Sequence, residues 1–565
     1  MTLESPSPLR PSLRTSWTTI LCDSLEKVFP DTTPRPMDTT IKFAAFQGET
    51  VSFQVAFQPP SLVGGGRLPN VVVDEITMPA GVRAEVGVVD LVPATFLAFD
   101  GHDDGYLRDT AGLYPDPIRP LGADAVQPFV GQWRAIWIDV TVADDAAAAT
   151  VPLAIGLRTT DGTEIGSHSL DLEIVAAALP PLGLVNTHWF HCDGLALHYG
   201  VEVFSEEHWA IVDAQMGIAA EIGINSLLTP VWTPPLDTPR GEVRLPVQLL
   251  GITVDDDGAY AFDFTGLRRW IAMAKSHGIA YLEVAHLFTQ WGATATPAIY
   301  VEHGGVTERR FGWDVPATDP SYVALLEALL PELRAVLDAE WGLGTVFFHI
   351  SDEPHGDQAT TYLAARQVVD ALLDGCTIID ALSDFELYTS GTVPIPVVAT
   401  DAAEPFLEAK VDPLWLYYCV GQNTDVANRF VGMPSSRNRA LGAQLYLTGA
   451  AGFLQWGFNF YLAFDSSRVI DPFQTPDAGG GFPAGDPFLV YPGPGGVPWH
   501  SVRSRVFAEA VGDVRLMQLV RDLAGDDVVR GIVDPDTTLT LTNYSLDPDH
   551  YRRMRAALVE RVLAG

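Results

Sequence analysis

The chain has little of several features that mark particular classes of protein. Of its 565 residues only four are lysine and four are cysteine, and 34 basic residues face 71 acidic ones, giving a formal net charge of -37. Nucleic acids and anionic membranes bind through basic patches, so this balance argues against both as partners. It does not indicate a cationic substrate, because most of the acids are expected on solvated surface.

The cysteines are too far apart for a metal or redox motif. Cys22, Cys192, Cys376 and Cys419 form no C-x-x-C pair, which argues against a zinc ribbon. Such wide spacing in a large domain is typical of reduced, buried thiols. We expect no cofactor. The oligomeric state is not indicated.

Export and membrane signals are also missing. The N-terminal stretch MTLESPSPLRPSLRTSWTTI has no apolar segment behind a basic start, so it does not resemble a signal peptide. The most apolar long stretch, GAAGFLQWGFNFYLAF (449–464), has 16 residues, fewer than the ~18–20 that a spanning helix needs. We therefore expect a soluble cytoplasmic protein, although a leaderless export route or a misplaced start codon would escape this argument.

What is present begins with a β-rich region from about residue 17 to 176. A chain of this length is expected to form two or more domains. In VSFQVAF (51–57) apolar residues alternate with Ser52, Gln54 and Ala56, as in a strand with one face on a core. Asp161-Gly162 between two apolar runs indicates a hairpin. This region predicts a β-sandwich, followed by a linker at 177–184.

After the linker, apolar strands alternate with amphipathic helices. Ser205 predicts the start of a helix over 204–223, and Pro331 predicts a break or kink in a helix over 321–342. Strands that are apolar on both faces indicate a parallel sheet covered on both sides. Eight strand candidates favour a (β/α)8 barrel; a doubly wound sheet is the alternative, but no G-x-G-x-x-G follows any strand. The predicted strands are 185–191, 224–230, 279–287, 345–351, TIIDALS, PIPVVAT, LWLYYCV and GFLQWGF.

The fold prediction is thus multi-domain: a β-sandwich, a TIM-like barrel and a C-terminal helical extension packed on the barrel. The predicted boundaries are 1–16 for an N-terminal tail, 17–180 for the sandwich, 181–500 for the barrel and 501–565 for the extension.

Two adjacent acids end the fourth predicted barrel strand. FFHISDEPH (347–355) places Asp352 and Glu353 after a run of apolar residues and before Pro354. Active sites of such barrels lie at the carboxyl ends of the strands. Neighbouring side chains on a strand point to opposite faces, so both acids reach the mouth only if the strand ends near Ser351. The alternative is a solvated turn in which Asp352 caps the next segment.

These segments resemble the family 123 glycoside hydrolases and relatives once catalogued as a domain of unknown function. The resemblance covers about residues 45 to 515, and it departs from the family at FAEAVGD (507–513), where only Glu509 and Asp513 match. No role is carried over for that region. The segments that carry it are FHISDEP (348–354), GFLQWGFNF (452–460), FLVYPGPGGVPWHSVR (488–503), THWFHCDGLALHYG (187–200) and GETVSFQVAFQ (48–58).

The resemblance implies a retaining β-N-acetylgalactosaminidase that uses substrate-assisted catalysis. In such enzymes the 2-acetamido oxygen of the sugar attacks the anomeric carbon, so no enzymatic nucleophile is needed. By matching motif, Asp352 would orient the acetamido group and Glu353 would act as general acid/base. One acid must stay charged and the other must arrive protonated, and their adjacency splits the two titrations.

Aromatic and polar residues near other strand ends are candidates for holding the sugar. Trp456 is expected to stack on the ring, Asn459 to bond a hydroxyl, and Tyr417 to bond the acetamido carbonyl. His191 and Asp193 end the first strand and are expected to hold hydroxyls. Each of these residues has packing in the barrel core as its alternative.

Two segments also invite a metal interpretation. His188, His191, Cys192 and Asp193 lie close in sequence, but residues 188 and 191 of a strand face opposite sides, so a shared ion is awkward. DGHDDGYLRD (100–109) is acidic but lacks EF-hand spacing and a closing Glu. We therefore expect no metal site.

Two other functions stay open. A glycosidase for sugars without a 2-acetamido group would need a further carboxylate, for which Glu283 and Asp380 are the candidates. A non-catalytic carbohydrate-binding protein is the third hypothesis, and the intact acid pair counts against it.

Overall fold

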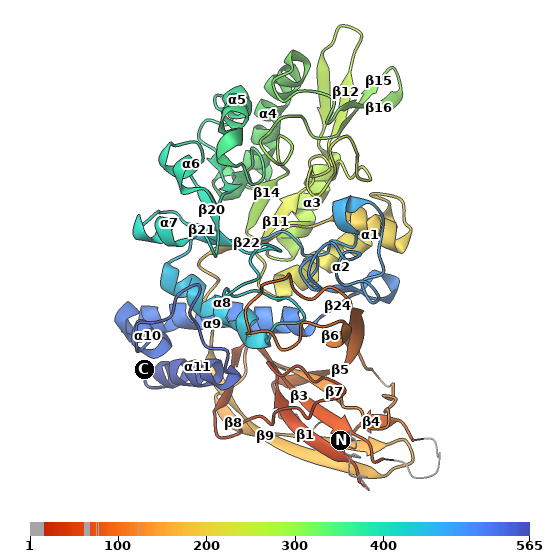
Figure 1. Cartoon of the computed structure of the whole chain (residues 1–565), viewed down its shortest axis with the longest axis vertical. Coiled ribbons are helices and arrows are strands. Elements are labelled where there is room, and N and C mark those ends of the chain that lie inside the picture. The colour runs from red at the N-terminus through yellow and green to blue at the C-terminus, as the bar shows by residue number, and fades with distance from the viewer. Residues whose placement is uncertain (1–15, 62–67, 75, 77, 123) are drawn as a thin grey trace, which may run out of the picture. The chain divides into compact units, whose positions relative to one another are not determined.

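The computed structural model describes residues 16–61, 68–74, 76, 78–122 and 124–565 (Figure 1). The chain divides into two compact units: Met1–Asp90 with Ile118–Leu179, and Leu91–Pro117 with Pro180–Gly565. The predicted N-terminal tail, apart from Ser16, lies outside the described residues.

The first unit is built on two sheets, as the alternating pattern predicts, although the end of β5 and most of β6 belong to the second unit. The first sheet has the order β1-β3-β7-β5-β6, and the second has the order β2-β9-β8-β4. The hairpin expected at Asp161-Gly162 joins β8 to β9, which pair antiparallel. The strands are β1 Thr18–Asp23, β2 Phe43–Gln47, β3 Thr50–Gln58, β4 Val71–Val73, β5 Val82–Ala94, β6 Gly112–Pro120, β7 Arg134–Val142, β8 Ala149–Thr159 and β9 Glu164–Ala178.

The two sheets contribute to one apolar core. Phe53 on β3, Ile136 on β7 and Leu172 on β9 are fully buried members of it. The other face of β3 is buried as well, which the alternation did not predict. There Ser52 Oγ donates to Asp139 at 2.6 Å, so the polar residues of this strand are hydrogen-bonded within the protein and not solvated.

The second unit is built on a parallel sheet that nearly closes into a barrel. Its nine strands have the order β18-β17-β14-β11-β10-β22-β21-β20-β19. The two end strands, β18 and β19, are separated by Ile379 alone. The strands are β10 Val185–His188, β11 Ser226–Thr229, β14 Tyr281–Val284, β17 Val346–Phe348, β18 Thr377–Ile378, β19 Asp380–Ala381, β20 Pro396–Ala399, β21 Trp415–Tyr417 and β22 Gly452–Gln455.

Helices alternate with these strands, as the sequence predicts. Ser205 caps α2 by accepting the backbone N–H of His208. Pro331 does not break α4, which continues through it. The helices are α1 Cys192–Tyr199, α2 Glu206–Glu221, α3 Thr265–Ser276, α4 Pro320–Glu340, α5 Ala359–Val369, α6 Phe385–Thr389, α7 Glu404–Glu408 and α8 Ser435–Thr448.

A four-stranded sheet that the sequence analysis missed interrupts the alternation. Its order is β13-β12-β15-β16, and Figure 1 draws it at the top of the view. It is formed by segments that follow β11 and β14, so it extends from the carboxyl ends of two barrel strands. Its members are β12 Gly251–Val254, β13 Tyr260–Asp263, β15 Ile299–His303 and β16 Val306–Phe311.

The chain ends in helices that surround a buried ion-pair cluster. Arg439 on α8 binds Asp513 on α9 at 2.6 Å, and Arg555 on α11 approaches the same carboxylate at 3.0 Å. Glu509 also pairs with Arg439. This cluster joins three helices, which gives the 507–513 segment a structural role. The remaining elements are β23 Tyr491–Pro492, β24 Pro498–Trp499, α9 Val502–Ala524, α10 Asp526–Val533 and α11 Pro548–Leu563.

Over the described ranges, the structure contains no helix with the length and apolar character needed to cross a membrane.

Candidate active site

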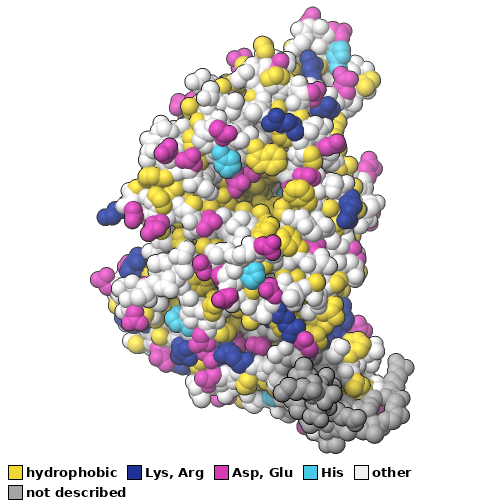
Figure 2. Space-filling view, viewed as in Figure 1, with side chains coloured by type: hydrophobic (Ala, Val, Ile, Leu, Met, Phe, Trp, Pro, Cys, Tyr) yellow, Lys and Arg dark blue, Asp and Glu magenta, His cyan; other side chains and the backbone are white. Residues whose placement is uncertain are grey.

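The two adjacent acids lie beyond the end of β17, in a turn and not on the strand. β17 stops at Phe348, and Asp352 and Glu353 are both partly exposed. Glu353 has a φ of +45°, a left-handed conformation that side chains rarely adopt. Strand alternation therefore does not apply to the pair. Figure 2 shows a hollow lined by hydrophobic side chains in the part of the view where Figure 1 draws β11, β14 and β22.

Tyr417, at the end of β21, reaches Glu353. Its hydroxyl donates to Glu353 Oε1 at 2.5 Å, and Ser383 Oγ lies 3.3 Å from the same hydroxyl. Burial, followed by the Glu353 charge, raises the pKa of Tyr417 well above its ordinary value, so it remains a donor. The sequence placed Tyr417 against an acetamido carbonyl; in the structure its hydroxyl is engaged with the acid.

Asp352 is hard to ionise. Burial, followed by the neighbouring Glu353 charge, raises the pKa of Asp352 well above its ordinary value, and the charge of His349 opposes the rise. Burial therefore disfavours the charge that the mechanism implied by the family resemblance needs on Asp352 when an acetamido group is bound.

The alternative carboxylates, Glu283 on β14 and Asp380 on β19, are fully buried on either side of His349. His349 Nε2 lies 2.9 Å from Glu283 Oε2, and His349 Nδ1 lies 3.5 Å from Asp380 Oδ1. Burial disfavours a charge on His349, but Asp380 and Glu283 outweigh it and raise the pKa of the imidazole to about 9.

Further donors complete this buried group. Trp189 Nε1 donates to Glu283 at 3.0 Å, and the Tyr362 hydroxyl donates to Asp380 at 2.5 Å. The backbone N–H of Ile350 donates to Asp380 at 3.0 Å. Both carboxylates are therefore hydrogen-bonded to other groups of the protein, which makes them poor candidates for a nucleophile or a base.

Trp456 follows β22, which three strands separate from β17 in the sheet order. Its ring packs edge-on against Phe460 and Phe482, with centroids 5.0 and 5.1 Å away, and it remains partly exposed. Its Nε1 donates to Asp486 at 2.9 Å. Burial raises the pKa of Asp486 to about 7. In a nearly closed barrel, Trp456 thus lies across the mouth from the acids.

His191 and Asp193 are buried and paired with Arg244. Asp193 accepts from Arg244 Nε and Nη2, both at 2.7 Å, and Arg244 Nη2 lies 3.1 Å from His191 Nδ1. Burial, and then the Arg244 charge, lowers the pKa of His191 to about 3. Its Nε2 lies 2.8 Å from the Trp456 carbonyl, to which it must donate. These residues support Trp456 from behind.

Asn459 is also occupied within the protein. It is fully buried, its Oδ1 accepts the backbone N–H of His191 at 2.7 Å, and its Nδ2 lies 3.4 Å from Gln215. The structure therefore brings together Asp352, Glu353 and Tyr417, and places Trp456 across from them. His191, Asp193 and Asn459 form a layer behind Trp456.

The segments considered for metals are held by other partners. His188 Nδ1 lies 3.3 Å from Arg429. In the 100–109 loop, Asp103 accepts the backbone N–H of Gly105 and of Asp425, both at 2.7 Å, and pairs with Arg437. Within the described ranges, no group of three or more His, Cys, Asp or Glu side chains has metal-binding geometry.

Three residues of this site escaped the sequence analysis: Arg244, Asp486 and Trp291. Trp291 follows β14 and is exposed, and its backbone N–H donates to the Asp352 carbonyl at 3.1 Å. Arg244 and Asp486 lie in long loops without helical or strand periodicity. A prediction that Asp193 is buried would have required a cationic partner for it, and this requirement is the one signal that could have indicated Arg244.

Comparison with known proteins identifies related catalytic domains. Residues 189–520 match the family model described as glycoside hydrolase 123, catalytic domain. The structure is similar to that of a family 123 glycoside hydrolase from Clostridium perfringens, reported in a study of glycolipid glycan hydrolysis, with a TM-score of 0.73, 11% identity and coverage of 97% of this chain and 99% of that one. No curated protein matches.

More distant similarities have low scores. A β-glucuronidase from Parabacteroides merdae gives a TM-score of 0.28 at 9% identity, over 72% of this chain and 45% of that one. An endo-β-1,4-mannanase from Thermotoga petrophila gives 0.32 at 12% identity, over 60% of this chain and 77% of that one.

Proposed function

The chain belongs to glycoside hydrolase family 123, and we propose that it is a retaining exo-acting enzyme that removes terminal β-linked N-acetylgalactosamine-like residues with help from the substrate's own 2-acetamido group. Its substrate is a carbohydrate. We also interpret β18, Ile379 and β19 as one strand, which makes the barrel eight-stranded, and the sheets of the first unit as a β-sandwich. The proposed domain boundaries stay at 17–180, 181–500 and 501–565.

One observation carries the substrate-assisted mechanism. Asp352 and Glu353 are partly exposed at the strand ends, whereas the other candidate carboxylates, Glu283 and Asp380, are buried and bound to His349. A double-displacement mechanism on an enzymatic nucleophile needs a second free carboxylate across the sugar. At the corresponding position across the mouth lies Trp456, whose aromatic ring can stack on a sugar face but cannot act as a nucleophile.

The first chemical step breaks the glycosidic bond. The acetamido oxygen forms a bond to the anomeric carbon, the bond to the leaving oxygen breaks, and Glu353 gives its proton to that oxygen. Asp352 accepts the acetamido N–H and stabilises the positive charge that develops on the ring so formed. Water then forms a bond to the anomeric carbon while Glu353 takes its proton, and the bond between that carbon and the acetamido oxygen breaks. This second displacement restores the acetamido group and the original anomeric configuration.

Asp352 must be charged when the substrate binds. Its pKa is raised by burial and by the neighbouring Glu353 charge. A hydrogen bond from the acetamido N–H favours the charged form of Asp352. Binding of the acetamido group therefore supports the charge on Asp352 that the mechanism needs.

A panel of p-nitrophenyl glycosides together with a thiazoline analogue of N-acetylgalactosamine tests this proposal. We expect hydrolysis of the 2-acetamido galactoside and strong inhibition by the thiazoline, which mimics the cyclic intermediate. An enzyme that ignores the thiazoline and hydrolyses a sugar without the acetamido group would refute the mechanism. The glycosidase that uses Glu283 or Asp380 predicts that second result.

A further inference from the structure

We infer that Trp291 forms the binding platform for the leaving group, and that this leaving group is a sugar ring and not a small alkyl or aryl group. The inference rests on the proposed function for the identity of the sugar that is cleaved and for the roles of Asp352 and Glu353. It concerns the other side of the scissile bond, for which none of the preceding arguments assigns a residue.

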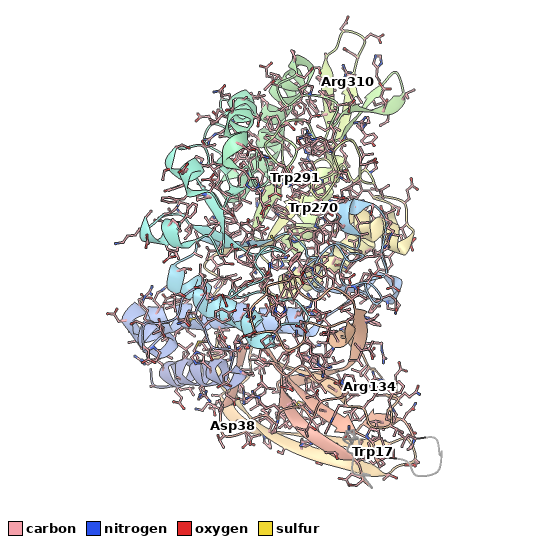
Figure 3. All side chains as sticks on the ribbon, in the orientation of Figure 1. Trp17, Asp38, Arg134, Trp270, Trp291 and Arg310 are labelled. Carbon is pink, nitrogen blue, oxygen red and sulfur yellow. The ribbon has the colours of Figure 1, made fainter. Side chains whose placement is uncertain are left out.

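The side chain of Trp291 is exposed, although a large aromatic surface in contact with water is unfavourable. Its exposed fraction is 42%, and it is the only tryptophan among the exposed large hydrophobic side chains of the described residues. A large aromatic surface left in water favours contact with a ligand. In Figure 3, Trp291 lies close to the position at which Figure 1 draws β14.

The backbone places Trp291 directly beside the acid pair. The segment after β14 runs along the segment after β17: the N–H of Leu287 donates to His349 O and that of Phe288 to Ile350 O, both at 3.0 Å. Further along the same two segments, the N–H of Trp291 donates to the Asp352 carbonyl at 3.1 Å. The indole is thus on the acids' side of the mouth, whereas Trp456 is on the opposite side.

This position corresponds to the leaving-group side of the scissile bond. The cleaved sugar must lie between Trp456 and the acids, because Asp352 has to reach its acetamido group. The general acid Glu353 must contact the leaving oxygen. The ring attached to that oxygen therefore continues past the acids, toward the rim where the neighbouring exposed surface is the Trp291 indole.

The loop that carries Trp291 is held rigidly. Thr289 closes it through two hydrogen bonds with the backbone of Ala295, one from each residue's N–H, at 3.1 and 3.2 Å. Ser351 Oγ donates to the Thr289 carbonyl at 2.8 Å, and Gln290 Oε1 accepts the N–H of Asp237 at 2.8 Å. A platform fixed on both sides loses little conformational freedom when a ring stacks on it.

The backbone conformation of Trp291 indicates a function more than a packing role. Its φ is +60°, a region in which glycine is far more favourable than any bulky residue. An exposed tryptophan gains little from packing to offset this strain. A glycine at this position is therefore expected to fold at least as well, which separates the role of the side chain in binding from any role in folding.

The test compares two substrates that share a sugar and differ in the leaving group. One is methyl β-N-acetylgalactosaminide, which has no ring on that side; the other is the disaccharide N-acetylgalactosaminyl-β-1,3-galactose. We expect Trp291→Gly to lower kcat/KM for the disaccharide by about tenfold, the scale of one aromatic stacking contact. We expect the methyl glycoside to change by less than about twofold. Trp291→Phe keeps a flat ring and is expected to lie between.

A matched control is Trp341→Ala. Trp341 is partly exposed but lies at the end of α4, before β17, and so at the opposite end of the barrel strands. We expect no selective loss from it. An equal loss on both substrates, no loss on the disaccharide, or a lower melting temperature of Trp291→Gly that accounts for the loss would each overturn the inference.

Failure of the proposed sugar specificity is distinguishable. If the wild type hydrolyses neither substrate, the N-acetylgalactosamine proposal fails. The same comparison is then made with the methyl glycoside and the disaccharide of the sugar identified by the nitrophenyl panel, where Trp291 still predicts a loss confined to the disaccharide.

Discussion

The second unit holds two groups of acids that differ in what surrounds them. Glu283 and Asp380 lie on strands, fully buried, with His349 between them and further donors from Trp189, Tyr362 and the backbone. Asp352 and Glu353 lie in the next turn, partly exposed, with Tyr417 as their one side-chain donor among the described residues. A carboxylate whose hydrogen-bond donors all come from the protein stabilises the fold. A carboxylate with few such donors is available to bind a substrate.

The buried group also affects the exposed pair. His349 carries a positive charge because its two carboxylates raise its pKa to about 9, even though burial opposes that charge. That charge limits the rise in the pKa of Asp352. The charge of His349 therefore favours the charged form of Asp352, which the proposed mechanism needs when an acetamido group binds.

The largest effect is expected from removing the charge of Asp352. Asp352→Asn keeps the size of the side chain but loses the partner of the charged intermediate, and we expect kcat to fall by roughly 10⁴-fold, since misplacement and lost electrostatics each cost ~10² or more. The thiazoline should bind the variant far more weakly than the wild type. Asp357→Asn, an exposed acid five residues later, is the control. Unchanged thiazoline affinity in Asp352→Asn would contradict the assignment.

Next in size is the loss of Glu353, the proposed general acid. Glu353→Gln is expected to reduce hydrolysis of substrates with poor leaving groups by about 10³-fold, within the ~10²–10⁴ that general acid catalysis supplies. Activated aryl glycosides scarcely need protonation and should lose much less. The two rates are compared with those of Glu332→Gln, an exposed glutamate on α4. Equal losses on both substrate classes would assign the acid elsewhere.

Replacing His349, which shares the buried group with Glu283 and Asp380, should mainly lower the free energy of unfolding. His349→Gln leaves Glu283 and Asp380 buried without a cation, and we expect a loss of about 3 kcal/mol in the free energy of unfolding. His303→Gln, which alters an exposed histidine, serves as the control and should change little. Denaturant unfolding measures both.

The pH dependence of that loss follows from the raised pKa of His349. Because the folded pKa, about 9, lies above the unfolded value near 6.5, the stabilisation is complete below about pH 6.5 and disappears as the pH rises through 9. The difference in stability between wild type and His349→Gln should therefore be largest near pH 6 and shrink above pH 9. A difference that grows with pH would show that His349 is neutral.

The smallest effect concerns Tyr417. Tyr417→Phe removes the hydroxyl that donates to Glu353 Oε1 at 2.5 Å. Without this hydrogen bond the carboxyl group is held less firmly in place, and we expect kcat/KM to fall by about tenfold. Tyr446→Phe removes a similar bond, from Tyr446 to Asp526 at 2.7 Å, outside the mouth and should leave kcat/KM unchanged. Unchanged kcat/KM in Tyr417→Phe would contradict this role.

Much of the fold could be predicted because its signals are local. Alternation in residues 51–57, the Asp161-Gly162 turn and the Ser205 cap each depend on neighbours in sequence, and each appears in the structure. The inserted sheet β12–β16 was missed because its strands are short and pair across segments that are far apart along the chain. The family resemblance, carried by several short motifs together, is confirmed by the match over residues 189–520.

By itself, the sequence identified the glycoside hydrolase family through its motifs, and it predicted as catalytic acids two adjacent carboxylates after an apolar strand. Only the tertiary structure decided which groups are engaged. It paired Asp193 with Arg244, directed Tyr417 to Glu353, enclosed Glu283 and Asp380 around His349, and left Trp291 in solvent beside Asp352. The reason is physical. Hydrogen bonding, burial and the resulting pKa values depend on contacts between residues that are far apart along the chain, and local sequence patterns do not indicate such contacts.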